Sequence, residues 1–161
     1  MLAEHPSTTY FHDVPFFSLD ELDLHEVLRS MVRELRKTVD FQWVSMYAFD
    51  NRRNVLQEVN LAENNGFNFI EVVKFNSGRG LAAWVAQQKR PVVLSSVHRG
   101  QRFRSNPVKS FLCCPIICND VTLGVVTLGH SIPNFFTNST LTTLLNFFRR
   151  YLAEYFIETY S

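Results

Sequence analysis

The feature that most constrains this chain of 161 residues is a change in the period of its hydrophobic residues. Apolar residues recur at steps of three and four in residues 18–38 and again from residue 137 nearly to the last residue, which is the spacing of amphipathic helices. Between these segments, β-branched, aromatic and apolar residues form short runs that are separated by turn residues, as in strands. The chain therefore predicts two terminal helices and a β-rich middle.

Both predicted helices carry start signals. Ser18 has Glu21 three residues on, which is a capping-box arrangement, and Thr137 precedes the second helical period. The two apolar helix faces consist of Leu24, Val27, Leu28, Met31, Val32, Leu35 and Val39, and of Leu141, Leu144, Leu145, Phe148, Leu152, Tyr155 and Phe156. Residues 1–17 show no period, and we expect them to form an irregular arm that packs its aromatic residues on the body.

Six strands and one short helix are predicted for the middle of the chain. The strands are expected at residues 41–49, 54–61, 70–75, 92–94, 111–118 and 121–130, and the short helix at residues 81–88. This order describes an α+β fold, an antiparallel sheet of about six strands with the N- and C-terminal helices on one face. Because no repeat, linker or low-complexity tract interrupts residues 18–161, they are expected to form one domain.

Charge and composition argue against several partners. Lys and Arg number 16 against 15 Asp and Glu, a formal net charge of +1, so the balance does not favour nucleic acid or an anionic membrane. The one basic run is residues 99–109. No apolar run approaches the roughly 20 residues that span a bilayer, and the first residues lack the pattern of a signal peptide. We expect a cytoplasmic protein.

Three cysteines, Cys113, Cys114 and Cys118, crowd into one apolar segment. Neighbours on a strand point to opposite faces, so free buried thiols are expected. Burial raises the pKa of a thiol, whereas an attacking thiolate requires a lowered one. The set also lacks a fourth ligand and the spacing of a zinc or iron–sulfur knuckle, so no metal site is predicted.

Two segments carry a family resemblance. In residues 78–94 a Gly-Arg-Gly turn leads a short helix and then a Pro-Val strand, and in residues 110–137 the motifs Pro-Ile, Gly-Val and Phe-Thr follow in order. With the element order, these motifs resemble a GAF domain, a small-molecule-sensing domain of bacterial signalling proteins, over nearly the whole chain. Gly78 and Gly80 would allow positive φ at a strand-to-helix turn, and Gly124 inside a strand marks a close backbone approach.

The resemblance implies a GAF/PAS-like sheet with a ligand pocket on the face opposite the terminal helices, covered by residues 78–88 and 95–109. The covering loop brings cationic and polar groups over an aromatic floor, which suits an anionic or polar small molecule. A solvated basic loop is the alternative. The candidate ligand-binding residues are Trp43, Tyr47, Trp84, His98, Arg102, Phe103, Phe111 and Cys113. The sequence does not reveal which sheet face carries those that lie on strands.

The resemblance does not name the ligand or a cofactor. Cyclic-nucleotide-binding GAF domains carry an Asn-Lys…Phe…Asp-Glu signature, of which this chain keeps only Phe136. Bilin-binding members use a loop cysteine beside a histidine, and here the loop has His98 without a cysteine. A non-covalent haem through His98 or His130 is the weaker alternative, since a lone loop histidine is usually solvated.

Free methionine-sulfoxide reductases are the enzymatic branch of this fold, and they need an attacking thiolate and a resolving thiol in a pocket. The three cysteines here share one predicted strand, and no nucleophile elbow, Walker loop or carboxylate pair occurs. The sequence therefore predicts that the chain is not an enzyme.

The predicted function is a ligand-sensing regulatory domain of a signal-transduction protein, which acts on an effector domain or a partner protein. The alternative is a protein-interaction and dimerisation module with a vestigial pocket, and a free methionine-sulfoxide reductase ranks third. A homodimer through the terminal helices is expected, because their apolar faces are wider than one sheet face should bury.

Overall fold

The computed structural model describes residues 21–61, 80–95 and 108–160, with side chains at residues 23–61, 80–95 and 108–155. Several sequence predictions lie outside these ranges and stay untested. They are the arm at residues 1–17, the Ser18 cap, the strand at residues 70–75, and the loop residues His98, Arg102 and Phe103.

Three helices and five strands make up the described part of the chain. Their bounds are α2 Glu21–Leu35, β1 Trp43–Asp50, β2 Val55–Glu58, α4 Leu81–Gln88, β3 Val92–Leu94, β4 Ser110–Cys118, β5 Val121–His130 and α5 Asn138–Tyr160. The strands form one antiparallel sheet in the order β2-β1-β5-β4-β3. The predicted α+β class is confirmed, with five strands in the described part where about six were expected.

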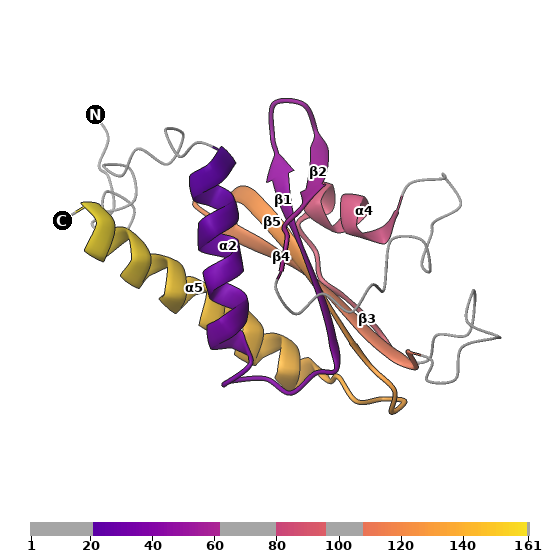
Figure 1. Cartoon of the computed structure of the whole chain (residues 1–161). Helices are drawn as coiled ribbons and strands as arrows, with labels where there is room; N and C mark the ends of the chain where they lie inside the picture. The colour runs from indigo at the N-terminus through magenta and orange to yellow at the C-terminus, as the bar shows by residue number, and fades with distance from the viewer. Residues whose placement is uncertain (1–20, 62–79, 96–107, 161) are drawn as a thin grey trace, which may run out of the picture.

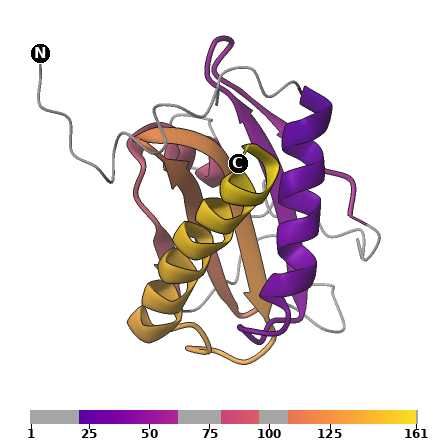
Figure 2. The same cartoon turned by 90° about the vertical axis from the view of Figure 1, so that its left-hand side faces the viewer.

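The sheet separates two layers of helix (Figure 1). Helices α2 and α5 cover one face, which we call the helix face, and α4 lies on the other, which we call the α4 face. After a quarter turn, α5 crosses in front of the sheet with α2 beside it (Figure 2). The prediction that both terminal helices share one face is confirmed.

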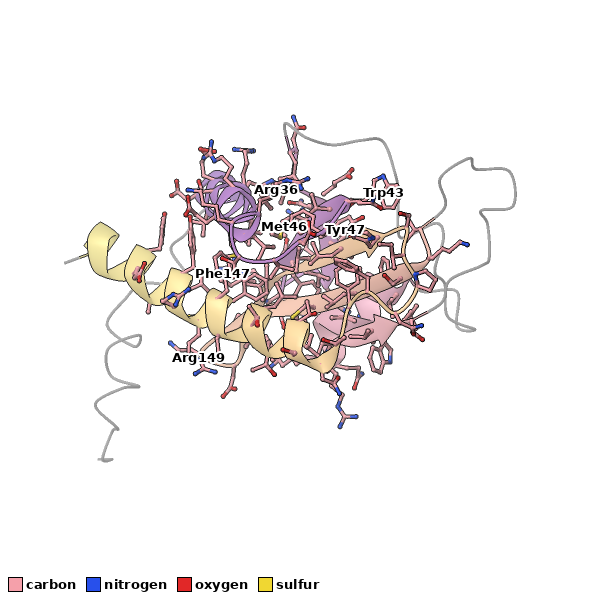
Figure 3. The ribbon with its side chains drawn as sticks, turned by 90° about the horizontal axis from the view of Figure 1, so that it is seen from below. Arg36, Trp43, Met46, Tyr47, Phe147 and Arg149 are labelled. Atoms are coloured by element: carbon pink, nitrogen blue, oxygen red, sulfur yellow. The ribbon has the colours of Figure 1, made fainter. Side chains whose placement is uncertain are left out.

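The apolar side chains of α2 and α5 are buried in the core on the helix face. Leu28, Met31 and Leu35 are fully buried, and Phe148 and Leu152 are each 2% exposed. In the view from below, Phe147 lies between α5 and the sheet, whereas Arg149 points away (Figure 3). The dimer prediction treated the apolar faces of the two helices as surplus surface. Their members Leu28, Met31, Leu35, Phe148 and Leu152 are already buried within one chain. The homodimer itself stays a prediction.

Helix α5 begins with the predicted cap. The amide of Thr140 donates to Oγ1 of Thr137 at 3.3 Å, and the amide of Thr137 donates to Oγ1 of Thr140 at 3.1 Å. Thr140 thus takes the place of the Glu or Gln in a capping box, and two amides without helical partners are satisfied.

Helix α2 ends at Leu35, where the sequence predicted about residue 38. The amides of Lys37 and Thr38 donate to carbonyls three residues back, at 3.1 and 2.9 Å. The last turn has therefore tightened toward 3₁₀ geometry, a common end of an α-helix. None of the described helices has the length and apolarity to cross a membrane.

Two glycine predictions have different outcomes. A Cβ on Gly124 would lie 2.3 Å from the carbonyl oxygen of Tyr47, so the predicted close backbone approach is confirmed. Gly80 caps α4 with φ −71° and ψ 158°, so the positive φ that glycine would allow is not used there. The left-handed residue lies at the other end of α4, where Lys89 has φ 60° and its amide donates to the Val85 carbonyl at 2.9 Å. Gly78 is outside the described residues.

Candidate functional site

A second hydrophobic core fills the α4 face of the sheet. Its buried members are Trp43, Tyr47, Phe49, Leu81, Ala82, Val85, Ala86, Val108, Phe111, Cys113 and Val125, and Leu56, Trp84, Val92 and Leu94 pack against it partly buried. We call this set the α4-face cluster. It contains every candidate ligand-binding residue that the structure describes, namely Trp43, Tyr47, Trp84, Phe111 and Cys113.

Strand alternation brings these side chains together. Trp43 and Tyr47 are four residues apart on β1, and Phe111 and Cys113 are two apart on β4, so each pair shares a face. The residues between them, such as Met46 and Leu112, belong to the core on the helix face. The sequence could not assign these candidate residues to a sheet face, and the structure places them on the α4 face, opposite the terminal helices.

A row of small polar side chains crosses this aromatic surface. In the sheet register Thr127 on β5 stands between Cys113 on β4 and Ser45 on β1. Ser45 is 5% exposed and Thr127 1%, and Oγ1 of Thr127 donates to the Ser45 carbonyl at 3.4 Å. We call Ser45, Thr127 and Cys113 the polar row. Sequence reasoning missed Ser45 and Thr127, although alternation along β1 places Ser45 on the face of Trp43 and Tyr47.

The aromatic residues flank the polar row along the strands. On one side of the row, Gly129 stands between Trp43 and Phe111 and adds no side chain between them. On the other side, Val125 is the partner of Tyr47. Hydroxyl and thiol groups thus lie among aromatic side chains, which is the lining typical of a small-molecule site.

The ionisable groups of this site are neutral near pH 7. Burial raises the pKa of Tyr47 to about 12, against a smaller lowering by its hydrogen bond with Ser45. Burial also raises the pKa of Cys113 well above its ordinary value, and the neighbouring Cys114 adds to this. The α4-face cluster itself therefore offers hydrogen-bonding groups and no cation, and the exposed Glu58, the register partner of Tyr47 on β2, places a carboxylate beside it.

Helix α4 is anchored to the sheet next to the turn between β4 and β5. Oγ1 of Thr122 donates to the Ala86 carbonyl at 3.0 Å, and Nζ of Lys89 donates to the Asp120 carbonyl. Thr127 lies five residues along β5 from Thr122, roughly 17 Å, whereas Leu81 lies only about 7.5 Å back along the helix from Ala86. The distance from Thr122 to Thr127 along β5 is thus about twice the length of α4 between Ala86 and Leu81.

The three cysteines are free and buried, as predicted. Cys113 belongs to the α4-face cluster, whereas Cys114 and Cys118 belong to the core on the helix face. Burial raises the pKa of Cys114 to about 12 and that of Cys118 to about 11. Four residues of strand separate the last two by about 13 Å, and a disulfide needs Cα atoms within about 7 Å.

His130 does not join the site. It lies near the start of α5 and stacks on Phe135, which packs against the core on the helix face. A haem on the α4 face would therefore not reach it. Within residues 21–61, 80–95 and 108–160, no group of three or more His, Cys, Asp and Glu side chains is arranged to hold a metal ion.

A hollow lies on the helix face, between α2 and α5. It is an open groove of about 410 Å³ lined by Glu34, Lys37, Thr38, Phe147, Arg150, Tyr151 and Glu154. Two carboxylates and two cations line it, so its charges balance. The chain thus has two surfaces on which a ligand could be sought, and only the α4 face holds the candidate residues.

Solved structures of similar fold include both enzymes and sensor domains. The fRMsr of Staphylococcus aureus in complex with substrate aligns with a TM-score of 0.61 and 19% identity over 96% of this chain and 97% of that one. The free methionine-R-sulfoxide reductase of Neisseria meningitidis in complex with its substrate gives 0.57 and 19% over 97% and 93%. The GAF domain of a two-component sensor histidine kinase from Bacillus halodurans gives 0.56 and 16% over 89% and 99%.

These comparisons correct one prediction. The expectation that the chain is not an enzyme is contradicted, because several of the structures that it resembles are methionine-R-sulfoxide reductases. Identities of 12 to 19% show a shared fold alone, and this fold supports catalysis as well as sensing. A search of curated proteins found no match.

The family assignment comes from the sequence itself. The model of the GAF domain family matches residues 23–151, which include all five described strands, most of α2, all of α4 and the first part of α5. The solved GAF domain of a sensor histidine kinase has the same fold. The chain therefore belongs to the GAF domain family.

Proposed function

We propose that this GAF domain binds a small molecule on its α4 face and acts as the ligand-sensing domain of a signal-transduction protein. The observation that carries the proposal is the polar row of Ser45, Thr127 and Cys113 set among Trp43, Tyr47 and Phe111. Binding sites are mostly apolar with a few convergent polar groups, and this face has that composition. An effector domain or a partner protein would receive the signal.

The remaining candidates complete the proposed site. His98, Arg102 and Phe103 belong to the loop that the family places over the pocket. Since the α4-face cluster contains no cation, the charge of an anionic ligand would be met by Arg102, whose guanidinium can hold a carboxylate or phosphate through two hydrogen bonds. A homodimer through the terminal helices stays part of the proposal, with less apolar surface to support it than the sequence suggested.

A second candidate function is reduction of free methionine sulfoxide, and its support is the fold shared with the reductases. Thiol-based reduction converts the sulfoxide and two thiols into a thioether, a disulfide and water. Among the three cysteines, Cys113 is on one face and the other two are about 13 Å apart along their strand. This reaction would therefore need a conformational change or a thiol from outside the chain.

Two matched threonine variants test the proposed site. Thr127→Val and Thr122→Val each remove a buried hydroxyl that donates to a backbone carbonyl, so both should destabilise the fold by about 1 kcal/mol. Only Thr127 belongs to the polar row. We expect Thr127→Val to weaken ligand binding by about three- to tenfold, which is the net effect of one hydrogen bond, and Thr122→Val to leave it unchanged.

The measurement is a thermal-shift screen followed by calorimetric titration. The panel contains free methionine sulfoxide, small carboxylates and phosphorylated metabolites, and the loss of methionine sulfoxide is followed with added dithiol. Equal loss of affinity in the two variants would remove the polar row from the binding site. A panel without any binder to the wild type would favour the alternative of an interaction module with a vestigial pocket.

A further inference from the structure

His130 holds the chain at two points just after β5. The residue is 7% exposed, and its Nδ1 accepts a hydrogen bond from the amide of Ile132 at 3.2 Å. Its ring stacks on Phe135, with the ring centroids 3.7 Å apart and the planes 15° from parallel. One imidazole therefore contacts both the first and the fourth residue after Ser131.

The segment held in this way, residues 131–137, joins three parts of the fold. Its start is tied to the residue before β1, because the amide of Ser131 donates to Oε1 of Gln42 at 2.7 Å. Its middle is tied to the end of β3, because the amide of Asn134 donates to the Ser95 carbonyl at 3.0 Å. It ends at Thr137, the cap of α5. A displacement of this segment would therefore act on both the end of β3 and the start of α5.

The hydrogen bond from Ile132 requires a neutral imidazole. Nδ1 accepts only while it carries no proton, and in the imidazolium both ring nitrogens are donors. Protonation would therefore place an N–H of the ring against the N–H of Ile132. The bond would be lost, and of the two contacts that the ring makes only the stacking on Phe135 would remain.

Burial lowers the pKa of His130, and the charge of Asp40 opposes this lowering. Asp40 is exposed and lies in the turn between α2 and β1. Lys109, whose amide donates to the His130 carbonyl at 2.8 Å, is also exposed. Because the pKa of His130 in the folded protein lies below the ordinary 6.5, the fold favours the neutral ring. The contribution of the neutral ring to the stability of the fold is complete above about pH 6.5 and is lost as the pH falls through the pKa of the folded protein.

We propose that His130 is a pH-operated latch on the connection between β5 and α5. The neutral ring holds Ile132 through its hydrogen bond, and protonation of Nδ1 breaks that bond while the ties to Gln42 and Ser95 remain. The latch lies on the helix face and uses none of the candidate ligand-binding residues. It therefore adds a response to acid that is independent of the proposed ligand.

The test is a pH titration from 7.5 to 4.5 followed by NMR. In the wild type, the amide signals of Ile132 and Asn134 should move with the same midpoint as the His130 ring. Their hydrogen-exchange protection, corrected for the intrinsic pH dependence, should fall by about two- to tenfold across that midpoint, the effect expected for one hydrogen bond.

Three variants separate the hydrogen bond from the stack and from the charge. His130→Asn keeps an acceptor for the amide two residues on, as in an Asx turn, and cannot titrate, so protection should not depend on pH. His130→Phe keeps an aromatic ring without an acceptor, so Ile132 should be unprotected at every pH. Asp40→Asn removes the opposing charge and should lower the midpoint. His25→Gln is the control and should leave the profile unchanged.

Two results would overturn the latch. One is a wild-type titration in which the Ile132 amide does not follow the His130 ring. The other is a titration of that amide that persists in His130→Asn. If His130→Asn does not fold, the wild type and Asp40→Asn still test the latch. In both proteins the titration midpoint of the Ile132 amide must equal that of the His130 ring, and Asp40→Asn must lower the two midpoints together.

Discussion

Cys113 and Cys114 are neighbours in the chain and belong to opposite layers of the molecule. Strand alternation predicted that Cys113 and Cys114 would point to opposite faces of the sheet, and that Trp43 and Tyr47 would point to the same face. It could not assign the faces, because alternation is relative and the assignment depends on where α4 packs. Ser45 and Thr127 were missed for a related reason, since a small polar residue on a strand gives the same signal whether water or another layer covers it.

Gly124 supplies a prediction at this scale. A Cβ there would lie 2.3 Å from the carbonyl oxygen of Tyr47 and 3.1 Å from Cδ1 of Leu28. The first neighbour is backbone in a paired strand and cannot turn aside, so Gly124→Ala should destabilise the fold by about 1–3 kcal/mol or more. Denaturant unfolding measures the change. A variant as stable as the wild type would show that β1 and β5 separate more easily than this packing implies.

At the scale of elements, the cap of α5 could be predicted more firmly than the backbone angles at Gly80. Thr137 was expected to cap α5 and does so, because a hydroxyl at that position has amides to satisfy whatever packs around it. Gly80 would allow a positive φ and does not adopt it, since glycine permits that conformation without requiring it. The 3₁₀ end of α2 could not be predicted, because the apolar period continues to Val39 beyond the last helical residue.

The α5 cap can be tested with two threonines of the same helix. Thr137→Ala removes the hydroxyl that accepts from the Thr140 amide, and it should destabilise the fold by about 0.5–2 kcal/mol. Thr142 is exposed inside the helix, and Thr142→Ala should be neutral or slightly stabilising because alanine is the better helix former. Thermal unfolding of both variants gives the comparison, and equal losses would argue against a role for the cap.

At the scale of the whole molecule, the sheet separates two hydrophobic cores. The terminal helices and the sheet bury the larger core, and α4 packs on the opposite face. Enzymes and sensor domains share this arrangement, which is why fold and family were predictable from motif order while catalysis was not. The proposed function rests on the few side chains on the α4 face.

The most direct test of the central claim is where a bound molecule lies. Amide chemical shifts are mapped while the panel member that binds most tightly is titrated to saturation. The account predicts that the largest changes fall on Ser45, Cys113 and Thr127. Changes centred instead on Glu34, Lys37 and Tyr151, in the groove between α2 and α5, would contradict it.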